Sequence, residues 1–344
     1  MSRRFVAVLC CSMLVIAGAS AQTAPPPDTD PLSAGDRLNF RTALQLARHL
    51  GDRLWPGWAG APAGTVLVLR HHDVLLCAPG PVDGYRPAAS EPAVGCSVQA
   101  RRRREVPVPP DPFTVVGTSP TVVLGRALYP ERVWPLWTTT WLHEHFHQFQ
   151  MADPGYLPAL DRLDLANGDR TGRWMLAYPF PYDDMRVVGT YQSLARALLA
   201  LFRAVDGDDD GGAPRAADAY RAAKQAFREA LSAADYRYAA FQAWQEGVAR
   251  YTEYRIGRMV ASASDLPPDL RGHVDTGRFD RDADQLLRTT LGDLERADLA
   301  RQRRLAFYAI GMVEALVLDA LRPDWRAQYR QYRFDLDRLL AAPG

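Results

Sequence analysis

Residues 134–151 read WPLWTTTWLHEHFHQFQM and contain the pattern H-E-x-x-H, formed by His143, Glu144 and His147. Side chains four residues apart lie on one face of a helix, with Cβ atoms about 5–6 Å apart. The spacing therefore predicts that both imidazoles point toward one metal ion. Glu144 is turned about one helical step from that face, close enough to contact a water bound to the ion.

A broad apolar surface indicates that this segment forms a buried helix. Pro135 suits a first helical position, where no backbone hydrogen bond is lost, and Asp153-Pro154-Gly155 is expected to end the helix. A dry wall around the ion would strengthen its electrostatic effect. The alternative is two unconnected histidines on an ordinary helix. The apolar side chains are Trp134, Trp137, Trp141, Leu142, Phe146 and Phe149.

The pattern H-E-x-x-H is the zinc metalloprotease signature, with two imidazole ligands and a carboxylate general base. A catalytic zinc takes three protein ligands and a water, so a third ligand must come from elsewhere. The extended pattern with a nearby third histidine is excluded, because Gln150 and Asp153 occupy its glycine and histidine positions. The remaining histidines are His49, His71, His72 and His273, and none lies in a strong helical pattern near the motif.

Glu246 is the best candidate for the third ligand. It lies in a helix predicted over 235–261, beside small residues that would let a partner helix approach closely. Gly247 inside this helix costs up to about 1 kcal/mol relative to alanine, which favours a packing reason for it. The alternative is a salt-bridged surface glutamate, with Arg250 as its partner. The apolar stripe of the helix consists of Trp244, Val248 and Tyr251.

Through these residues the chain resembles the gluzincin class of zinc metallopeptidases. The matching residues are His143-Glu144-x-x-His147 and then Glu246, about a hundred residues later, within Glu-Gly-x-Ala-Arg-Tyr. The resemblance implies Zn2+ held by His143, His147 and Glu246, with Glu144 as the general base. It also implies hydrolysis of peptide bonds in a peptide or protein substrate.

One position departs from the gluzincin pattern. Many gluzincins carry an aspartate four residues after the ligand glutamate, bonded to a ligand histidine, whereas this chain has Arg250 there. Support for the histidine must therefore come from elsewhere in the chain, with Glu253 as a candidate, and the subfamily stays open. Gluzincins often use a tyrosine or histidine to stabilise the oxyanion, and Tyr251, Tyr254 and Tyr308 remain open as candidates.

The order of elements predicts a helix-rich α+β protein with a zincin-like architecture. Residues 33–130 are expected to form an N-terminal α/β lobe, and residues 131–344 a helical metal-binding catalytic lobe, as one integrated catalytic unit. An edge strand within 113–125 is placed to hold an extended peptide by strand addition. Strands are predicted at 65–69, 74–77, 94–98, 113–117 and 121–125. Further helices are predicted from Ser33 or Asp36 to Leu54, and at 186–205, 214–233, 281–300, 301–321 and 325–341.

The sequence at the N-terminus has a pattern that indicates export of the protein. Residues 1–21 resemble a cleavable signal peptide, with two arginines at the start, a short apolar run and a cleavage site after Ala21. Residues 22–32 are expected to be a disordered lead-in. We therefore expect a periplasmic or secreted protein, with an uncleaved anchor as the alternative. The formal net charge of +1 indicates neither a nucleic acid nor an anionic membrane as a partner.

Two further features concern stability and a second ion. Cys77 and Cys96 remain after signal removal, and a disulfide is the simplest state for such a pair in an exported protein. Two free buried thiols are the alternative. Asp206–Gly211 matches the first six positions of a calcium loop, but Ala217 stands at its twelfth position in place of the bidentate glutamate. A solvated turn is the default interpretation of this segment.

The prediction is thus an exported zinc-dependent metallopeptidase. One alternative is a zinc hydrolase of a non-peptide amide or ester, which would use the same site. The other is a non-catalytic exported metal-binding protein, in which a fourth protein ligand would close the site. His145 is expected to point away from the face of His143 and His147, and so not to be that ligand.

Overall fold

The computed structural model describes residues 31–88, 91–103, 112–115, 119–125, 134–169, 171–207 and 212–341. Over these residues the protein is helix-rich, with one small sheet in its N-terminal part, as the sequence predicted. The predicted signal peptide at 1–21 and residues 22–30 of the predicted lead-in lie outside the described residues. No helix in the described part of the chain is long and apolar enough to cross a membrane.

The sheet has six strands in the order β3-β4-β2-β1-β6-β5. β1 runs parallel to β6, with Val66 opposite Val123, and every other neighbouring pair is antiparallel. β5 is therefore an edge strand. The strand bounds are β1 Thr65–Val68, β2 His72–Leu76, β3 Arg86–Pro87, β4 Val98–Arg102, β5 Phe113–Val115 and β6 Thr121–Gly125.

Two sequence predictions for the sheet need correction. The turn between β1 and β2 lies earlier than predicted, because the Leu69 N–H donates to the His72 carbonyl at 2.8 Å. The strand predicted at 94–98 is wrong, because Val94 ends the short helix α2 (Glu91–Val94) and β4 begins only at Val98. Gly95, with a φ of 83°, adopts the left-handed conformation that commonly ends a helix.

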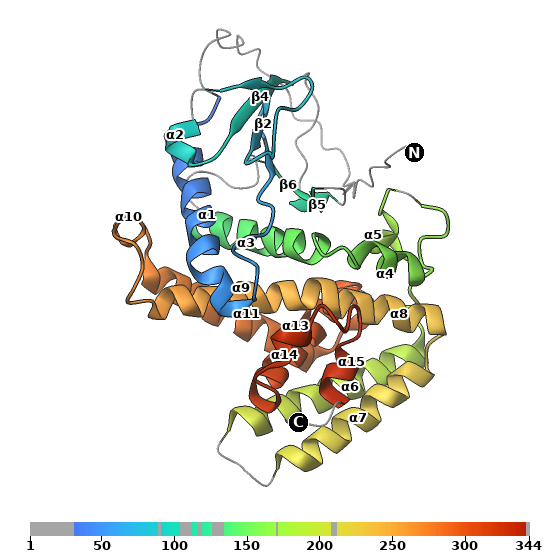
Figure 1. The fold of residues 1–344 in the computed structure, drawn as a ribbon. Coiled ribbons are helices and arrows are strands. Elements are labelled where there is room, and N and C mark those ends of the chain that lie inside the picture. The colour runs from blue at the N-terminus through green and yellow to red at the C-terminus, as the bar shows by residue number, and fades with distance from the viewer. Residues whose placement is uncertain are drawn as a thin grey trace, which may run out of the picture.

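The first and third helices connect the sheet to the rest of the molecule. α1 (Ala34–Leu54) begins with a capping box, in which the Asp36 N–H donates to the Ser33 hydroxyl at 3.1 Å. α3 (Trp134–Met151) runs beneath the sheet, and α9 (Val248–Ser262) packs along its far side (Figure 1). The Trp141 indole N–H donates to the Thr65 hydroxyl at 3.0 Å and so ties α3 to β1.

The C-terminal part follows the predicted helical pattern with several interruptions. The helix predicted over 281–300 ends at Arg296, before Ala297 with its positive φ, and the helix predicted over 301–321 is interrupted at Arg303, also at positive φ. The helix predicted over 325–341 is interrupted over 329–335. The helix predicted over 235–261 contains a π-helical turn, η2. The bounds are α4 Tyr156–Arg162, α5 Trp174–Ala177, α6 Met185–Asp206, α7 Ala213–Glu229, α8 Ala233–Gln242, η2 Ala243–Gly247, α10 Pro268–Arg271, α11 Thr276–Arg296, α12 Leu299–Gln302, α13 Leu305–Leu321, α14 Trp325–Gln328 and α15 Leu336–Ala341.

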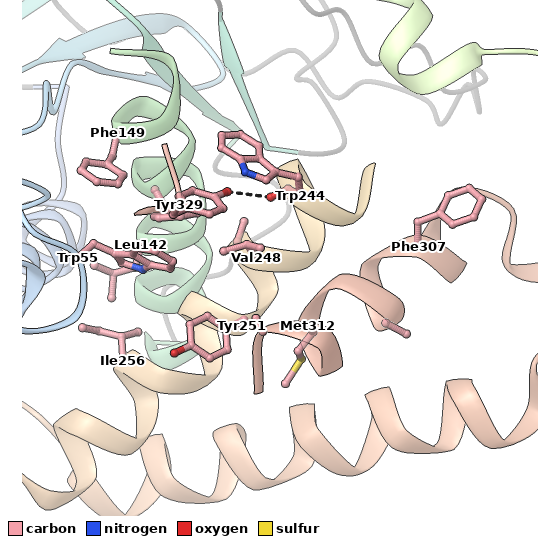
Figure 2. Packing of buried hydrophobic residues seen from close by; sticks show 14 of the residues in the cluster. Trp55, Leu142, Phe149, Trp244, Val248, Tyr251, Ile256, Phe307, Met312 and Tyr329 are labelled. Atoms are coloured by element: carbon pink, nitrogen blue, oxygen red, sulfur yellow. Dashed lines mark hydrogen bonds between the residues drawn. The ribbon is translucent and has the colours of Figure 1, made fainter. Parts of the chain in front are cut away.

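An aromatic cluster joins α3 to η2 and α14. The ring of Trp55 lies 5.0 Å from Phe146, 5.3 Å from Trp325 and 4.9 Å from Tyr329. Tyr329 stacks on Trp244 at 4.3 Å, and its hydroxyl donates to the Trp244 carbonyl at 2.8 Å (Figure 2). Since buried aromatic rings contribute large contact areas, this cluster holds the histidine-bearing helix against the segment that carries Glu246.

The predicted disulfide is present in the structure. Cys77, directly after β2, is bonded to Cys96, which precedes β4, with a sequence separation of 19. Closing a loop of this length stabilises a fold by about 3 kcal/mol in the chain-entropy model. The bridge joins the ends of two strands that also pair in the sheet.

Candidate metal centre

The two motif histidines share one face of α3, as their spacing predicted. Their ring centroids lie 4.9 Å apart. Together with Glu144 they form a group that could hold a metal ion, since each side chain offers one ligand atom and these three atoms lie within 4.8 Å of one another. His147 and Glu144 are buried, and His143 is nearly so.

The structure also brings Glu246 to these histidines. One carboxylate oxygen, Oε2, lies 3.6 Å from Nε2 of His143 and 3.4 Å from Nε2 of His147. Both distances exceed the usual 2.7–3.2 Å of an N–H···O hydrogen bond. Ligands bound tetrahedrally at about 2.0–2.1 Å from zinc lie roughly 3.3–3.4 Å from one another. The two distances from Glu246 therefore match the spacing of ligands that share one cation.

A close helix contact positions Glu246. A Cβ atom built on Gly247 would lie 2.5 Å from Cα of Gly311, and one built on Gly311 would lie 2.0 Å from the Ala243 carbonyl oxygen. The packing reason predicted for Gly247 is therefore confirmed. The π-helical turn over 243–247 was not predicted. Such turns insert one extra residue into a helix and occur frequently at functional sites.

Side-chain contacts occupy the Nδ1 atom of each imidazole. Nδ1 of His143 lies 3.3 Å from Oε2 of Glu253, and a carboxylate can only accept, so this nitrogen carries the proton. Nδ1 of His147 lies 2.6 Å from Oε1 of Gln150, whose amide nitrogen donates to the Gln245 carbonyl at 3.0 Å. Both Nε2 atoms face Glu246. The support predicted from Glu253 is present.

The electrostatics of the centre favour a positive charge beside Glu246. Burial lowers the pKa of His143, but contacts with the carboxylates of Glu246 and Glu253 outweigh it and raise the pKa to about 10. Burial raises the pKa of Glu246, but the positive charge of His147 and the contacts with both histidines hold it well below its usual range. A metal ion supplies the same positive charge and requires the histidines to be neutral.

Glu144 lies in a different setting from Glu246. Burial raises the pKa of its carboxyl group, and the Thr114 hydroxyl of β5 donates to its Oε2 at 2.8 Å. A buried carboxylate with a raised pKa suits proton transfer near neutral pH. The sequence did not reveal the role of Thr114, because only the packing of β5 on α3 brings the two side chains together.

A cleft of about 390 Å³ opens onto the centre. Six of its lining residues are apolar, and the others include two arginines and a tyrosine. The apolar lining consists of Pro112, Phe113, Met151, Met175, Leu176 and Leu305, and the polar lining of Thr114, His143, Glu144, His147, Gln245, Glu246, Arg250, Arg304 and Tyr308.

Of the three candidate tyrosines, Tyr308 lines this cleft. Burial raises the pKa of its phenol well above the ordinary value, and the charge of Glu246 beside it adds to the effect, so the hydroxyl stays protonated. The Tyr251 hydroxyl donates instead to Asp319 at 2.6 Å. Tyr254 lies on α9 and is not among the described residues that line the cleft.

His145 points away from the metal centre, as predicted. Its ring stacks on Trp141 with centroids 4.6 Å apart, and its Nδ1 lies 2.8 Å from Oε1 of Gln148. The side chain is buried in the contact between α3 and the sheet-bearing part. The calcium-loop prediction at Asp206–Gly211 is untested, because positions 208–211 lie outside the described residues.

Sequence reasoning missed two further contacts of His147. Gln150 follows it by three residues and so shares its helical face, a spacing that a search for polar neighbours would find. The Gln245 amide lies 3.1 Å from Nδ1 of the same imidazole and is adjacent to Glu246. No local pattern marks this second contact, because it depends on how η2 packs against α3.

No protein-family model, curated protein or solved structure matches this chain. The class of this protein is therefore inferred from its fold and its candidate site alone. The protein is helix-rich, has a small N-terminal sheet, and carries a group of two histidines and a glutamate able to hold a metal ion.

Proposed function

We propose that the protein is an exported zinc-dependent metallopeptidase of the gluzincin type. The observation that carries the proposal is the position of Glu246, with one oxygen 3.6 Å and 3.4 Å from the two Nε2 atoms of the motif histidines. Zinc is favoured because a two-imidazole, one-carboxylate set with an open fourth position is typical of catalytic zinc. A sheet edge beside the motif helix agrees with a zincin-like architecture.

The ion would be held by His143, His147 and Glu246. When bound, it would polarise the scissile carbonyl and lower the pKa of a water molecule toward about 7. Glu144 accepts the proton of the attacking water and passes it to the leaving amine. Burial keeps this carboxylate basic enough for the first transfer, and the Thr114 hydroxyl orients it through the 2.8 Å hydrogen bond.

Tyr308 is the residue we assign to oxyanion stabilisation. Its hydroxyl stays protonated and lies in the cleft beside Glu246. A donor aimed at developing negative charge stabilises the transition state more than the ground state. The substrate itself would lie along β5, because this edge strand borders the cleft and an extended peptide can add to a free edge.

Export is the second part of the proposal. The disulfide between Cys77 and Cys96 fits an oxidising compartment such as the periplasm or the extracellular medium. Residues 1–21 have the composition of a cleavable signal peptide. We expect the mature protein to start near Gln22 and to act without a nucleic-acid or membrane partner.

The decisive experiment is the substitution Glu144→Gln. The variant should bind zinc with the wild-type stoichiometry, because residue 144 is not a ligand in this scheme. Its rate of peptide hydrolysis should fall by about 10²–10⁴-fold, since a general base is lost. The matched control is Glu295→Gln, which changes an exposed glutamate that pairs with Arg203. If Glu144→Gln cleaved a peptide panel as fast as wild type, the mechanism would be wrong.

The two alternative functions receive less support. His145, the third imidazole of the segment, stacks on Trp141 and so is not a fourth ligand that would close a non-catalytic site. A zinc hydrolase of a non-peptide amide or ester would use the same residues. Turnover of matched peptide, amide and ester substrates separates this alternative from a peptidase.

A further inference from the structure

The two motif histidines differ in the partners of their Nδ1 atoms. Nδ1 of His143 faces a carboxylate oxygen, Oε2 of Glu253, at 3.3 Å. Nδ1 of His147 instead lies between two buried, neutral amides, 2.6 Å from Oε1 of Gln150 and 3.1 Å from Nε2 of Gln245. An amide oxygen accepts and an amide nitrogen donates, so the two contacts require opposite protonation of the same Nδ1 atom.

The ligand form of His147 requires an acceptor at Nδ1. An imidazole that binds a metal ion is neutral, and when Nε2 is the ligand atom its one proton lies on Nδ1. The amide oxygen of Gln150 is such an acceptor, and it is also the nearer of the two contacts. The orientation of the two amides therefore decides which side chain holds His147 in its ligand form.

Hydrogen bonds hold the amide of Gln150 in one orientation. Its Nε2 donates to the Tyr329 hydroxyl at 2.7 Å and to the Gln245 carbonyl at 3.0 Å. The Tyr329 hydroxyl gives its own proton to the Trp244 carbonyl at 2.8 Å, so it accepts from Gln150. Burial raises the pKa of Tyr329 well above its ordinary value and so keeps this proton in place. The reversed amide would place its oxygen against two acceptors.

The amide of Gln245 is not held in the same way. Its Oε1 accepts from the Tyr156 hydroxyl at 3.1 Å. Because a phenol hydroxyl can both donate and accept, Tyr156 can serve either end of this amide. Gln245 can therefore turn its oxygen toward a protonated Nδ1, and it does not define which nitrogen of His147 carries the proton.

We propose that Gln150 is a positioning residue of the metal centre, which fixes the ligand form of His147 through an amide oriented by Tyr329. This inference rests on the proposed zinc site and extends it to Tyr329, which follows α14 and lies 179 positions from Gln150 in the chain. The expected consequence is that the Tyr329 hydroxyl, acting through Gln150, controls how tightly zinc binds.

Zinc affinity, measured by competition with a chromogenic chelator, tests the inference without turnover. Gln150→Met should weaken the affinity by about 10–100-fold, the usual cost of losing a partner of a ligand histidine. Gln148→Met is the matched control, because Gln148 is buried on the same helix and contacts His145, which is not a proposed ligand, at 2.8 Å. Its amide also donates to two backbone carbonyls. This control variant should bind zinc as tightly as wild type, and circular dichroism verifies that each variant folds.

Two further substitutions distinguish an oriented acceptor from simple packing. Gln150→Glu keeps an oxygen that can accept from His147, whether its carboxyl group is ionised or protonated, so it should bind zinc more tightly than Gln150→Met. Tyr329→Phe keeps the ring that stacks on Trp244 and removes only the hydroxyl. It should weaken zinc affinity by about two- to tenfold, the net value of one hydrogen bond, because the Gln245 carbonyl still accepts from the amide.

A double variant tests whether Tyr329 acts through Gln150. Gln150→Met combined with Tyr329→Phe should bind zinc no more weakly than Gln150→Met alone, since the hydroxyl then has no amide to orient. An additive loss in the double variant overturns the inference. Equal zinc affinity of Gln150→Met and wild type, or of Gln150→Met and Gln150→Glu, also overturns it. An equal loss in Gln148→Met would do the same, because packing alone would then account for the effect.

These outcomes are separable from those of the proposed function. Zinc affinity does not depend on turnover, so the variants of Gln150 still test the positioning role if Glu144→Gln hydrolyses peptides as fast as wild type. In that case the proposed mechanism alone fails. If Glu144→Gln loses hydrolysis while Gln150→Met binds zinc as tightly as wild type, the peptidase stands and the positioning role fails.

Discussion

Two buried clusters of charged side chains differ in where their positive charge comes from. At the metal centre, Glu246 lies 3.4–3.6 Å from two imidazole nitrogens that are free to bind an ion. In the C-terminal helices, Lys224 places its ammonium directly against Glu314 and 2.5 Å from Asp337. The cluster around Lys224 thus contains its own positive charge. The cluster around Glu246 instead brings a carboxylate and two imidazoles to a point that suits a metal ion.

The difference distinguishes a cluster that could hold a metal ion from one that joins helices. Tyr220 donates to Glu314 at 2.5 Å and Tyr236 donates to Asp337, so the acids around Lys224 accept from protein donors on α7 and α8. Such a network joins α7 and α8 to α13 and α15. At the metal centre, protein hydrogen bonds instead occupy the Nδ1 atoms and leave the Nε2 atoms facing Glu246. In the proposed metal site this arrangement would orient the imidazoles, as partners of metal-bound histidines do.

The largest expected effect comes from removing a ligand. His147→Ala should lower zinc affinity by more than about a hundredfold, the upper range seen when only a supporting partner of a ligand is lost. Metal analysis of the purified mature chain measures it. Lys224→Met should retain full zinc content, because the second cluster is independent of the first. Equal zinc in His147→Ala and wild type would show that the centre is not a zinc site.

The next largest effect is expected on the free energy of unfolding when the ammonium group of Lys224 is removed. Lys224→Met leaves Glu314, which is fully buried, without its positive partner. Breaking a buried ion pair by deleting one partner destabilises a protein by about 3–5 kcal/mol. Urea unfolding of the apo protein measures the loss. A change below about 1 kcal/mol would contradict the assignment of this cluster to stability.

Glu253→Gln should have an intermediate effect on the metal centre. The glutamine keeps the shape but removes the charge that orients His143 through its Nδ1 proton. Loss of such a partner typically weakens metal affinity by about 10–100-fold. Competition with a chromogenic chelator measures the change. The matched control Glu229→Gln alters a glutamate of α7 and should leave zinc affinity unchanged.

The smallest expected effect is a change in pH dependence. Burial raises the pKa of Asp337, but the charge of Lys224 outweighs it and lowers the pKa below its ordinary value. A carboxyl group with a lowered folded-state pKa stabilises the fold above its unfolded pKa of about 3.9 and loses this contribution as the pH falls through the folded value. Asp337→Asn should therefore be less stable than wild type at pH 7, with the difference shrinking below about pH 4. Urea unfolding at pH 3–7 measures it, and a constant difference would count against the ion pair.

Local patterns predicted most elements of the fold and missed the interruptions between them. The helices at 134–151 and 186–205 and the strand at 121–125 agree with the structure within one residue, because each has a long apolar periodicity or a short β-branched run. The helices predicted over 301–321 and 325–341 were too continuous. Their breaks occur at Arg303 and over 329–335, and no sequence pattern marks the positive φ of Arg303 or Phe334.

The sequence by itself determined that two imidazoles one helical turn apart would share a face, because that relation depends only on the geometry of a helix. It also singled out Glu246 through the small residues around Gly247. Tertiary structure alone decided that this carboxylate reaches both imidazoles, since the contact of Gly247 with Gly311 and the π-helical turn arise from the packing of α9 against α13. The same packing brings Arg250 and Arg304 onto one tyrosine, a convergence of residues 54 positions apart that local periodicity does not encode.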